Sequence, residues 1–275
     1  MRLDQNTEGA LIAMVRAAAQ AEIMPRFRNL SAAAITEKSS TIDLVTEADV
    51  AAERHMTRRV ADILPGAVVI GEEAVSADPA TLARLPQAEV AVILDPIDGT
   101  WNFANGLATF GVILAVVVRG RTVFGLLYDP VMDDWVQASL GGGCWFAAPD
   151  RAPERLQVAA ERPFAEATGF LPHYLFPTAE QPRLVQGMIA ARRVNALCCS
   201  CHEYRMMAQG NADFIQTEGL HCWDHAAGVL AVQEAGGYAQ LVDGRDYAPV
   251  ISEGRLTVAT GPCMRDEVCA AFDLG

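Results

Sequence analysis

The segment AVILDPIDGTWNF, residues 91–103, constrains the fold most, because it places two carboxylates at the end of an apolar run. Four apolar residues precede Asp95, which is typical of a buried strand. Pro96 drives the residue before it towards an extended conformation and fixes its own φ. We therefore expect Asp95 and Asp98 to lie on one tight turn and to face one pocket. Two carboxylates in one pocket repel each other, so this arrangement requires a counter-charge.

The residues around this turn indicate what the counter-charge is. Clustered carboxylate oxygens suit Mg²⁺, which usually keeps water and substrate phosphate as its remaining ligands. Gly99 and Thr100 follow directly and are expected to open a short helix. The N–H groups and the dipole at a helix N-terminus favour a bound phosphate. Metal and phosphate at one turn together predict phosphoryl chemistry.

Three further acidic segments, TEAD (46–49), GEE (71–73) and WDHAAG (223–228), lie where strands or helices are expected to begin or end. Each also has a purely structural interpretation. Thr46 and Asp49 have the spacing of a helix capping box. Asp224 suits an N-cap or a first helical turn, and Glu72 and Glu73 could be solvated loop residues. Taken singly, each of these segments favours the structural role, since acids prefer caps and surfaces.

Composition limits the class of protein. The 275 residues are 51% hydrophobic, which suffices for one large domain or two packed subdomains. Lys and Arg total 21 and Asp and Glu total 34, so the net charge of −13 disfavours direct binding of nucleic acid or anionic membranes. No apolar run reaches the ~18 residues of a membrane span. Seven cysteines in a long chain indicate reduced thiols and a cytoplasmic location. The CCSC segment could suggest zinc, but buried free thiols are the favoured interpretation.

The pattern of elements divides the chain near residue 150. Helices are expected over about 8–28 and 46–64, and strand pairs over 110–130 and 134–147. Beyond about residue 149 strands alternate with helices, and DHAAGVLAVQEAGG, residues 224–237, is predicted as a helix with a glycine stop. We therefore predict residues 1–150 as an α+β half that carries most metal ligands. Residues 151–275 form an α/β half that contributes Asp224 and the substrate-side wall.

Taken together, these motifs resemble the inositol monophosphatase family of Mg²⁺-dependent, lithium-sensitive phosphatases. DPIDGTWNF and WDHAAGVLAVQEAGG resemble the two signatures of that family, and KSSTIDLVTEAD and GEE are similar to its upstream site motifs, in the same order. The resemblance extends from the N-terminal helix to about Gly237. It implies a layered α/β/α/β/α sandwich of the inositol monophosphatase and sugar phosphatase type, with the site between the halves. It also implies a homodimer.

The resemblance implies a site for two to three Mg²⁺ ions, whose ligands are the side chains of Glu72, Asp95, Asp98 and Asp224 and the carbonyl of Ile97. In the family, the residue that corresponds to Glu72 also reaches the weaker third ion. The two aspartates of DPID and the aspartate of WDHAAG would share the second ion.

The catalytic roles implied by the resemblance belong to Asp49, Thr100 and Glu72. Asp49 and Thr100 would orient and deprotonate the attacking water. Gly99 and Thr100 would donate backbone N–H groups to the phosphate. Lys38 corresponds to a lysine near the family's site.

Two departures concern the substrate side, for which we single out Lys38, Ser200, Cys201 and Thr217. Thr217 stands where the family commonly has a glutamate that contacts inositol hydroxyls. Ser200 and Cys201 stand where the family commonly has two alanines. These changes make myo-inositol 1-phosphate a doubtful substrate, although the metal ligands are unaffected.

The leading hypothesis is therefore a Mg²⁺-dependent phosphomonoesterase that hydrolyses a small polyol- or amino-alcohol-phosphate by attack of metal-activated water. A histidinol-phosphate phosphatase and a sugar- or nucleotide-bisphosphate phosphatase are the enzymatic alternatives. A regulatory role through a protein partner is the non-enzymatic alternative.

Overall fold

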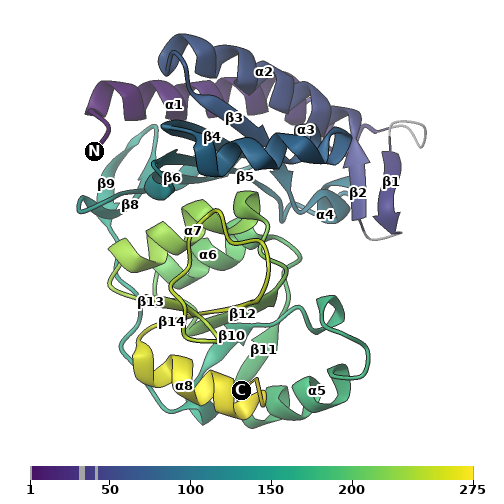
Figure 1. Ribbon diagram of the computed structural model, residues 1–275, viewed down its shortest axis with the longest axis vertical. Helices are drawn as coiled ribbons and strands as arrows, with labels where there is room; N and C mark the ends of the chain where they lie inside the picture. Colours follow the sequence, from purple (N-terminus) through teal and green to yellow (C-terminus); the bar gives the residue numbers. More distant parts are fainter. Residues whose placement is uncertain (1, 31–34, 41–42, 275) are drawn as a thin grey trace.

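Two β-sheets alternate with three layers of helices in the computed structural model, which describes residues 2–30, 35–40 and 43–274. Figure 1 shows the order of the layers from top to bottom: α1 and α2, a seven-stranded sheet, α6 and α7, a five-stranded sheet, then α5 and α8. The predicted α/β/α/β/α sandwich is confirmed. Within the described residues, no helix has both the length and the apolarity that a membrane span requires.

The seven-stranded sheet has the strand order β3-β4-β5-β6-β7-β8-β9, and only β3 and β4 pair in parallel. Its strands are β3 (Val68–Gly71), β4 (Val90–Asp98), β5 (Gly111–Val118), β6 (Arg121–Asp129), β7 (Asp134–Ser139), β8 (Gly143–Ala148) and β9 (Arg151–Arg155). Both predicted strand pairs are present. Arg119 and Gly120 have φ of 49° and 77°, as the tight turn between β5 and β6 requires.

Helices cover both faces of this sheet, which explains its continuous apolar strands. Val92 and Leu94 of β4 pack in one core with α1 (Gln5–Ala18) and α2 (Glu47–Ile63). Ala91 and Ile93 point the other way, into a second core with α6 (Ser200–Ala208) and α7 (Cys222–Glu234). Successive side chains of a strand thus enter different cores.

The remaining elements of the first half connect these strands and helices. The short pair β1 (Ile35–Ser40) and β2 (Asp43–Thr46) leads into α2, and the first helix continues as a π-helical stretch over Ala19–Ile23. Helix α3 (Glu72–Ala77) follows β3, a 3₁₀ segment covers Pro79–Gln87, and α4 (Thr100–Ala104) follows β4.

The middle layer packs closely against the first sheet. A Cβ on Gly125 of β6 would lie 2.8 Å from the carbonyl oxygen of Ala227 in α7, so only glycine permits this approach. Arg205 of α6 is buried, donates to the carbonyl of Leu127 at 2.9 Å and pairs with Asp134. These contacts fix α6 and α7 relative to the sheet that carries most of the predicted site.

The second sheet has the order β11-β10-β12-β14-β13. Its strands are β10 (Thr168–Phe170), β11 (Arg193–Asn195), β12 (Phe214–Glu218), β13 (Tyr238–Leu241) and β14 (Arg255–Ala259). Helices α5 (Gln181–Ala190) and α8 (Pro262–Ala271) pack with its outer face. The first sheet continues to Arg155, past the boundary predicted at residue 150, and one core joins α6 and α7 to both sheets.

Candidate active site

A β-bulge brings the two carboxylates of DPID to one side of the sheet. Asp95 lies opposite Ile113, whereas Asp98 lies opposite Gly111, so β4 contains one residue more than β5 over this interval. In a regular strand, residues three apart point to opposite faces. The additional residue removes this alternation, and Pro96, which has no N–H to pair, is tolerated at such an irregularity. The predicted tight turn is therefore wrong, because Asp95 and Asp98 both lie within strand β4, at a bulge.

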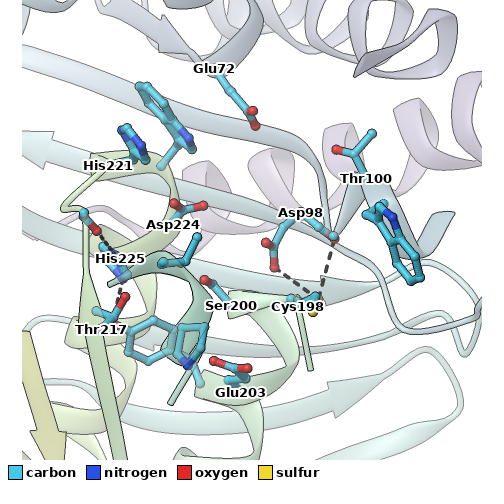
Figure 2. Close-up of a pocket in the computed structure, with 18 of the residues that line it drawn as sticks. Glu72, Asp98, Thr100, Cys198, Ser200, Glu203, Thr217, His221, Asp224 and His225 are labelled. Atoms are coloured by element: carbon cyan, nitrogen blue, oxygen red, sulfur yellow. Dashed lines mark hydrogen bonds between the residues drawn. The ribbon is translucent and has the colours of Figure 1, made fainter. Parts of the chain in front are cut away.

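Three carboxylates meet at this bulge, as Figure 2 shows for Asp98 and Asp224. One oxygen from each of Asp95, Asp98 and Asp224 lies within 4.8 Å of the other two. Asp224 comes from the first turn of α7, so the cluster joins the two halves of the chain. Within the described part of the chain, this is the group of metal-ligating side chains close enough to share one ion.

The electrostatics of the cluster fit a bound cation. Asp95 is buried and its Oδ1 has no hydrogen-bond partner. Burial, followed by the charges of Glu72, Asp98 and Asp224, holds the pKa of Asp95 well above its ordinary value. Burial likewise raises the pKa of Asp98 to about 6, against the hydrogen bonds donated by Cys201 and Cys199. Buried carboxylates that repel one another are the donor set that a hard divalent ion stabilises.

Glu72 lines the same pocket from the start of α3. Its position is set by Glu53 of α2, whose carboxylate accepts the N–H groups of Glu73 at 2.8 Å and Ala74 at 2.9 Å. A Cβ on Gly71 would lie 2.2 Å from the Glu53 carboxyl carbon, so glycine is needed before the helix. Glu53 was not singled out from the sequence, and it acts by anchoring the first turn that carries Glu72.

Asp49, Thr46 and Thr100 form a hydrogen-bonded group beside the carboxylate cluster. Asp49 is fully buried, and its Oδ2 accepts the Thr46 N–H at 2.8 Å and the Thr46 hydroxyl at 2.5 Å. Its Oδ1 lies 3.2 Å from Thr100 Oγ1, which is also 2.9 Å from the carbonyl oxygen of Ile97. The predicted capping box of Thr46 and Asp49 is therefore confirmed, and it also orients Asp49 towards Thr100.

The loop that joins β4 to α4 depends on a glycine and an asparagine. Gly99 has φ of 87°, and a Cβ there would lie 3.1 Å from the carbonyls of Cys198 and Thr109. The Asn102 side chain donates to the carbonyls of Thr109 at 2.7 Å and Leu197 at 2.8 Å. Asn102, which sequence reasoning did not select, thus ties the Gly99–Thr100 loop to the segment before α6.

These groups border a cavity of about 900 Å³. Ser200 and Thr217, predicted on the substrate side, both line it (Figure 2). Cys201 does not line it: its thiol is fully buried, 3.7 Å from the carbonyl oxygen of Tyr128, and its backbone N–H donates to Asp98 at 2.5 Å. Lys38 belongs to β1, and its side chain lies outside the described part of the structure.

Several lining residues escaped the sequence analysis, among them Tyr174, Glu203, Glu218 and His221. The Tyr174 hydroxyl donates to Cys198 Sγ at 3.1 Å, and the His221 ring stacks on Trp223 with centroids 4.9 Å apart. Glu203 follows Ser200 by one helical turn on α6, a spacing that could have placed it on the same side. All seven cysteines are free thiols, and the buried ones fill the core as expected.

A pocket with clustered buried carboxylates is typical of enzymes that bind divalent metal ions, phosphatases among them. Comparison with known proteins identifies the family. The model of the inositol monophosphatase family matches residues 4–273, and the chain therefore belongs to this family. Its curated relatives include phosphatases, and the family is in general metal-dependent.

The inositol-1-monophosphatase of Mycobacterium leprae is 32% identical over 242 residues, which cover 87% of this chain and 81% of the relative. The protein named Nus factor SuhB of Pasteurella multocida is 30% identical over 257 residues, covering 84% and 88%. Among solved structures, an inositol monophosphatase (IMPase) of Thermotoga maritima superposes with a TM-score of 0.82, at 23% identity, over 98% of both chains. This last similarity supports the fold alone.

Proposed function

We propose that this protein is a Mg²⁺-dependent phosphomonoesterase that hydrolyses a small polyol- or amino-alcohol-phosphate. The observation that carries this proposal is the cluster of Asp95, Asp98 and Asp224, whose ligand oxygens lie within 4.8 Å. The buried Oδ1 of Asp95 has no hydrogen-bond partner, which suits a site completed by a cation.

The proposed site holds two to three Mg²⁺ ions through the side chains of Glu72, Asp95, Asp98 and Asp224 and the carbonyl of Ile97. When bound, the ions neutralise the phosphate and leaving oxygen and lower the pKa of water. The chain itself positions the reactants, which is the larger part of catalysis in phosphoryl transfer.

Asp49 and Thr100 carry the proton transfer in this proposal. The Thr100 hydroxyl lies between Asp49 Oδ1 and the Ile97 carbonyl, at 3.2 and 2.9 Å. It can accept a hydrogen bond from the attacking water while its own proton points to Asp49. Asp49 cannot rotate away, because the Thr46 N–H and hydroxyl hold its other oxygen. Gly99 and Thr100 present the start of α4 to the phosphate.

The charge of the pocket favours a monophosphate over the bisphosphate alternative. Among the lining residues that the structure describes, none is lysine or arginine. From these described lining residues a second phosphate would therefore receive no guanidinium or ammonium partner. Thr217, in place of an anionic acceptor, also removes one partner for polyol hydroxyls, so myo-inositol 1-phosphate is expected to be a poor substrate.

Phosphate release from a panel of esters tests the proposal. Myo-inositol 1-phosphate, histidinol phosphate, glycerol phosphates and sugar monophosphates are compared at one Mg²⁺ concentration. Activity should vanish in EDTA and return with Mg²⁺. Asp98→Asn should lose several orders of magnitude in kcat, whereas Asp62→Asn, a change at an exposed acid paired with Arg59, should match the wild type. Hydrolysis that persists in EDTA would exclude this mechanism.

The homodimer implied by the family resemblance and the cytoplasmic location predicted from the cysteines are further parts of the proposal, as is the division of the chain into two halves near residue 150. Light scattering tests the dimer. A regulatory role through a protein partner is the alternative if none of the phosphate esters is hydrolysed.

A further inference from the structure

One acid in the pocket belongs to neither the metal cluster nor the Asp–Thr pair. Glu203 lies on α6, and its side chain lines the cavity although only 6% of the residue is exposed. Figure 2 shows Glu72 at one edge of the site and Glu203 at the other, with Asp98, Asp224 and Ser200 between them in the view. Glu203 therefore lies on the side where the organic part of a bound phosphate ester would extend.

The charges around Glu203 do not compensate it. Its Oε1 accepts the N–H of Leu197 at 2.8 Å, and it forms no ion pair with any described residue. By contrast Glu218, another acid that lines the cavity, pairs with Arg255 at 3.2 Å. Burial raises the pKa of Glu203 to about 8, against the hydrogen bond from Leu197. In the empty pocket at pH 7.5 Glu203 is therefore mostly protonated, and a cation that enters the pocket lowers this pKa and stabilises the charged carboxylate.

The neighbouring walls also suit a cation. Tyr174 and Tyr204 line the cavity, as do the stacked rings of His221 and Trp223. Aromatic faces attract ammonium and guanidinium groups, more so when water is excluded. A neutral polyol would gain from neither feature, and a second phosphate would find no cationic partner at Glu203.

We propose that Glu203 selects substrates whose organic part carries a cationic group, an ammonium or an imidazolium, placed across the pocket from the phosphate. This inference rests on the proposed phosphomonoesterase function and narrows its substrate class to amino-alcohol-type phosphates. Glu203 acts on the substrate's binding group and not on the reacting phosphorus.

Two esters of equal length isolate the cation. O-Phosphoethanolamine and 2-hydroxyethyl phosphate differ by an ammonium in place of a hydroxyl, and the amine is charged at pH 7.5. For the wild type we expect kcat/KM at least about tenfold higher for the amine, as one charge-assisted hydrogen bond would provide. Glu203→Gln should bring this ratio close to one and leave kcat/KM for the hydroxyl ester within about threefold.

Two further measurements keep the outcome unambiguous. Glu218→Gln removes another acid that lines the cavity and already has Arg255 as its partner, and it should preserve the preference for the amine. Glutamine can still accept the Leu197 N–H, so Glu203→Gln should fold, which the activity on the hydroxyl ester verifies. Equal kcat/KM for the two esters in the wild type, or a ratio that Glu203→Gln leaves unchanged, would overturn the inference.

Binding of 2-aminoethylphosphonate and 2-hydroxyethylphosphonate in the presence of Mg²⁺ reads the same preference without hydrolysis. If neither ester is hydrolysed but the amine still binds about tenfold tighter in a Glu203-dependent manner, the proposed catalytic function fails and the assignment of Glu203 stands. If the two phosphonates bind equally to the wild type, the assignment of Glu203 fails whatever the activity.

Discussion

Replacing Asp98 by asparagine is expected to stabilise the metal-free protein while it abolishes activity. Burial raises the pKa of Asp98 from 3.8 to about 6 in the folded chain, so the charged form is disfavoured there at neutral pH. Asparagine carries no charge, and its oxygen can still accept the hydrogen bond that the Cys201 N–H donates to Asp98. The variant thus keeps the contact and removes the buried charge.

The magnitude follows from the two pKa values. The difference between 3.8 and about 6, at about 1.4 kcal/mol per pH unit, corresponds to about 3 kcal/mol of unfolding free energy. Because the folded state binds the proton more tightly, this destabilisation is complete above the folded pKa and fades as the pH falls towards 3.8. In EDTA at pH 7.5, Asp98→Asn should therefore be more stable than the wild type by up to about 3 kcal/mol. The gap should close near pH 4.

Urea unfolding followed by circular dichroism measures the difference. Added Mg²⁺ should stabilise the wild type, because it binds the folded state, and should have little effect on Asp98→Asn. Asp133→Asn is the control of opposite sign: Arg16, at 2.6 Å, lowers the pKa of Asp133, so this change should destabilise with or without Mg²⁺. An Asp98→Asn protein that unfolds at the same or lower urea than the wild type in EDTA at pH 7.5 refutes the reasoning.

Three other substitutions test the positioning of the site and its support. Thr100→Ala should lower kcat far more than it raises KM in steady-state assays, since it removes an interaction made mainly in the transition state; an unchanged kcat would exclude Thr100 from the mechanism. Thr46→Ala should lower the free energy of unfolding, measured in urea, by about 1 kcal/mol. Because the Thr46 hydroxyl holds Asp49, the same change should also lower activity per folded molecule, and Thr46→Ser should restore both. Gly125→Ala should lower Tm by placing a Cβ 2.8 Å from a carbonyl oxygen of α7, whereas Gly9→Ala, in open space on α1, should not; equal melting of the two variants would contradict the packing described.

The carboxylate cluster could be anticipated from the sequence, but its geometry could not. The apolar run before Asp95 predicts a buried strand, and the spacing of Asp95 and Asp98 suggests a shared pocket. Whether the two side chains share a face depends on the pairing of β4 with β5, where Ile113 and Gly111 set the register. That register involves residues distant from DPID, and no local pattern reports it.

The substrate side was less predictable for a related reason. The motif predicts that the backbone of Cys201 lies beside the site. In the structure its thiol is buried in the core, and only its N–H contacts the site, by donating to Asp98. Glu203 resembles a surface acid in the sequence, and only the packing of α6 between two sheets buries it. Such residues acquire their roles from tertiary contacts, which override local preference.

The position of α7 between the two sheets has a consequence for how the protein opens. Ten of its thirteen residues are buried. Gly125 of β6 packs against Ala227 of α7, and Gly228 of α7 packs against Tyr204. Local opening is expected first where backbone is solvent-exposed and contacts are few, and last in such a layer. Amide hydrogens of α7 should therefore exchange only through global unfolding. Asp224 lies at the start of this helix, so the carboxylate cluster is expected to stay assembled while surface segments open locally.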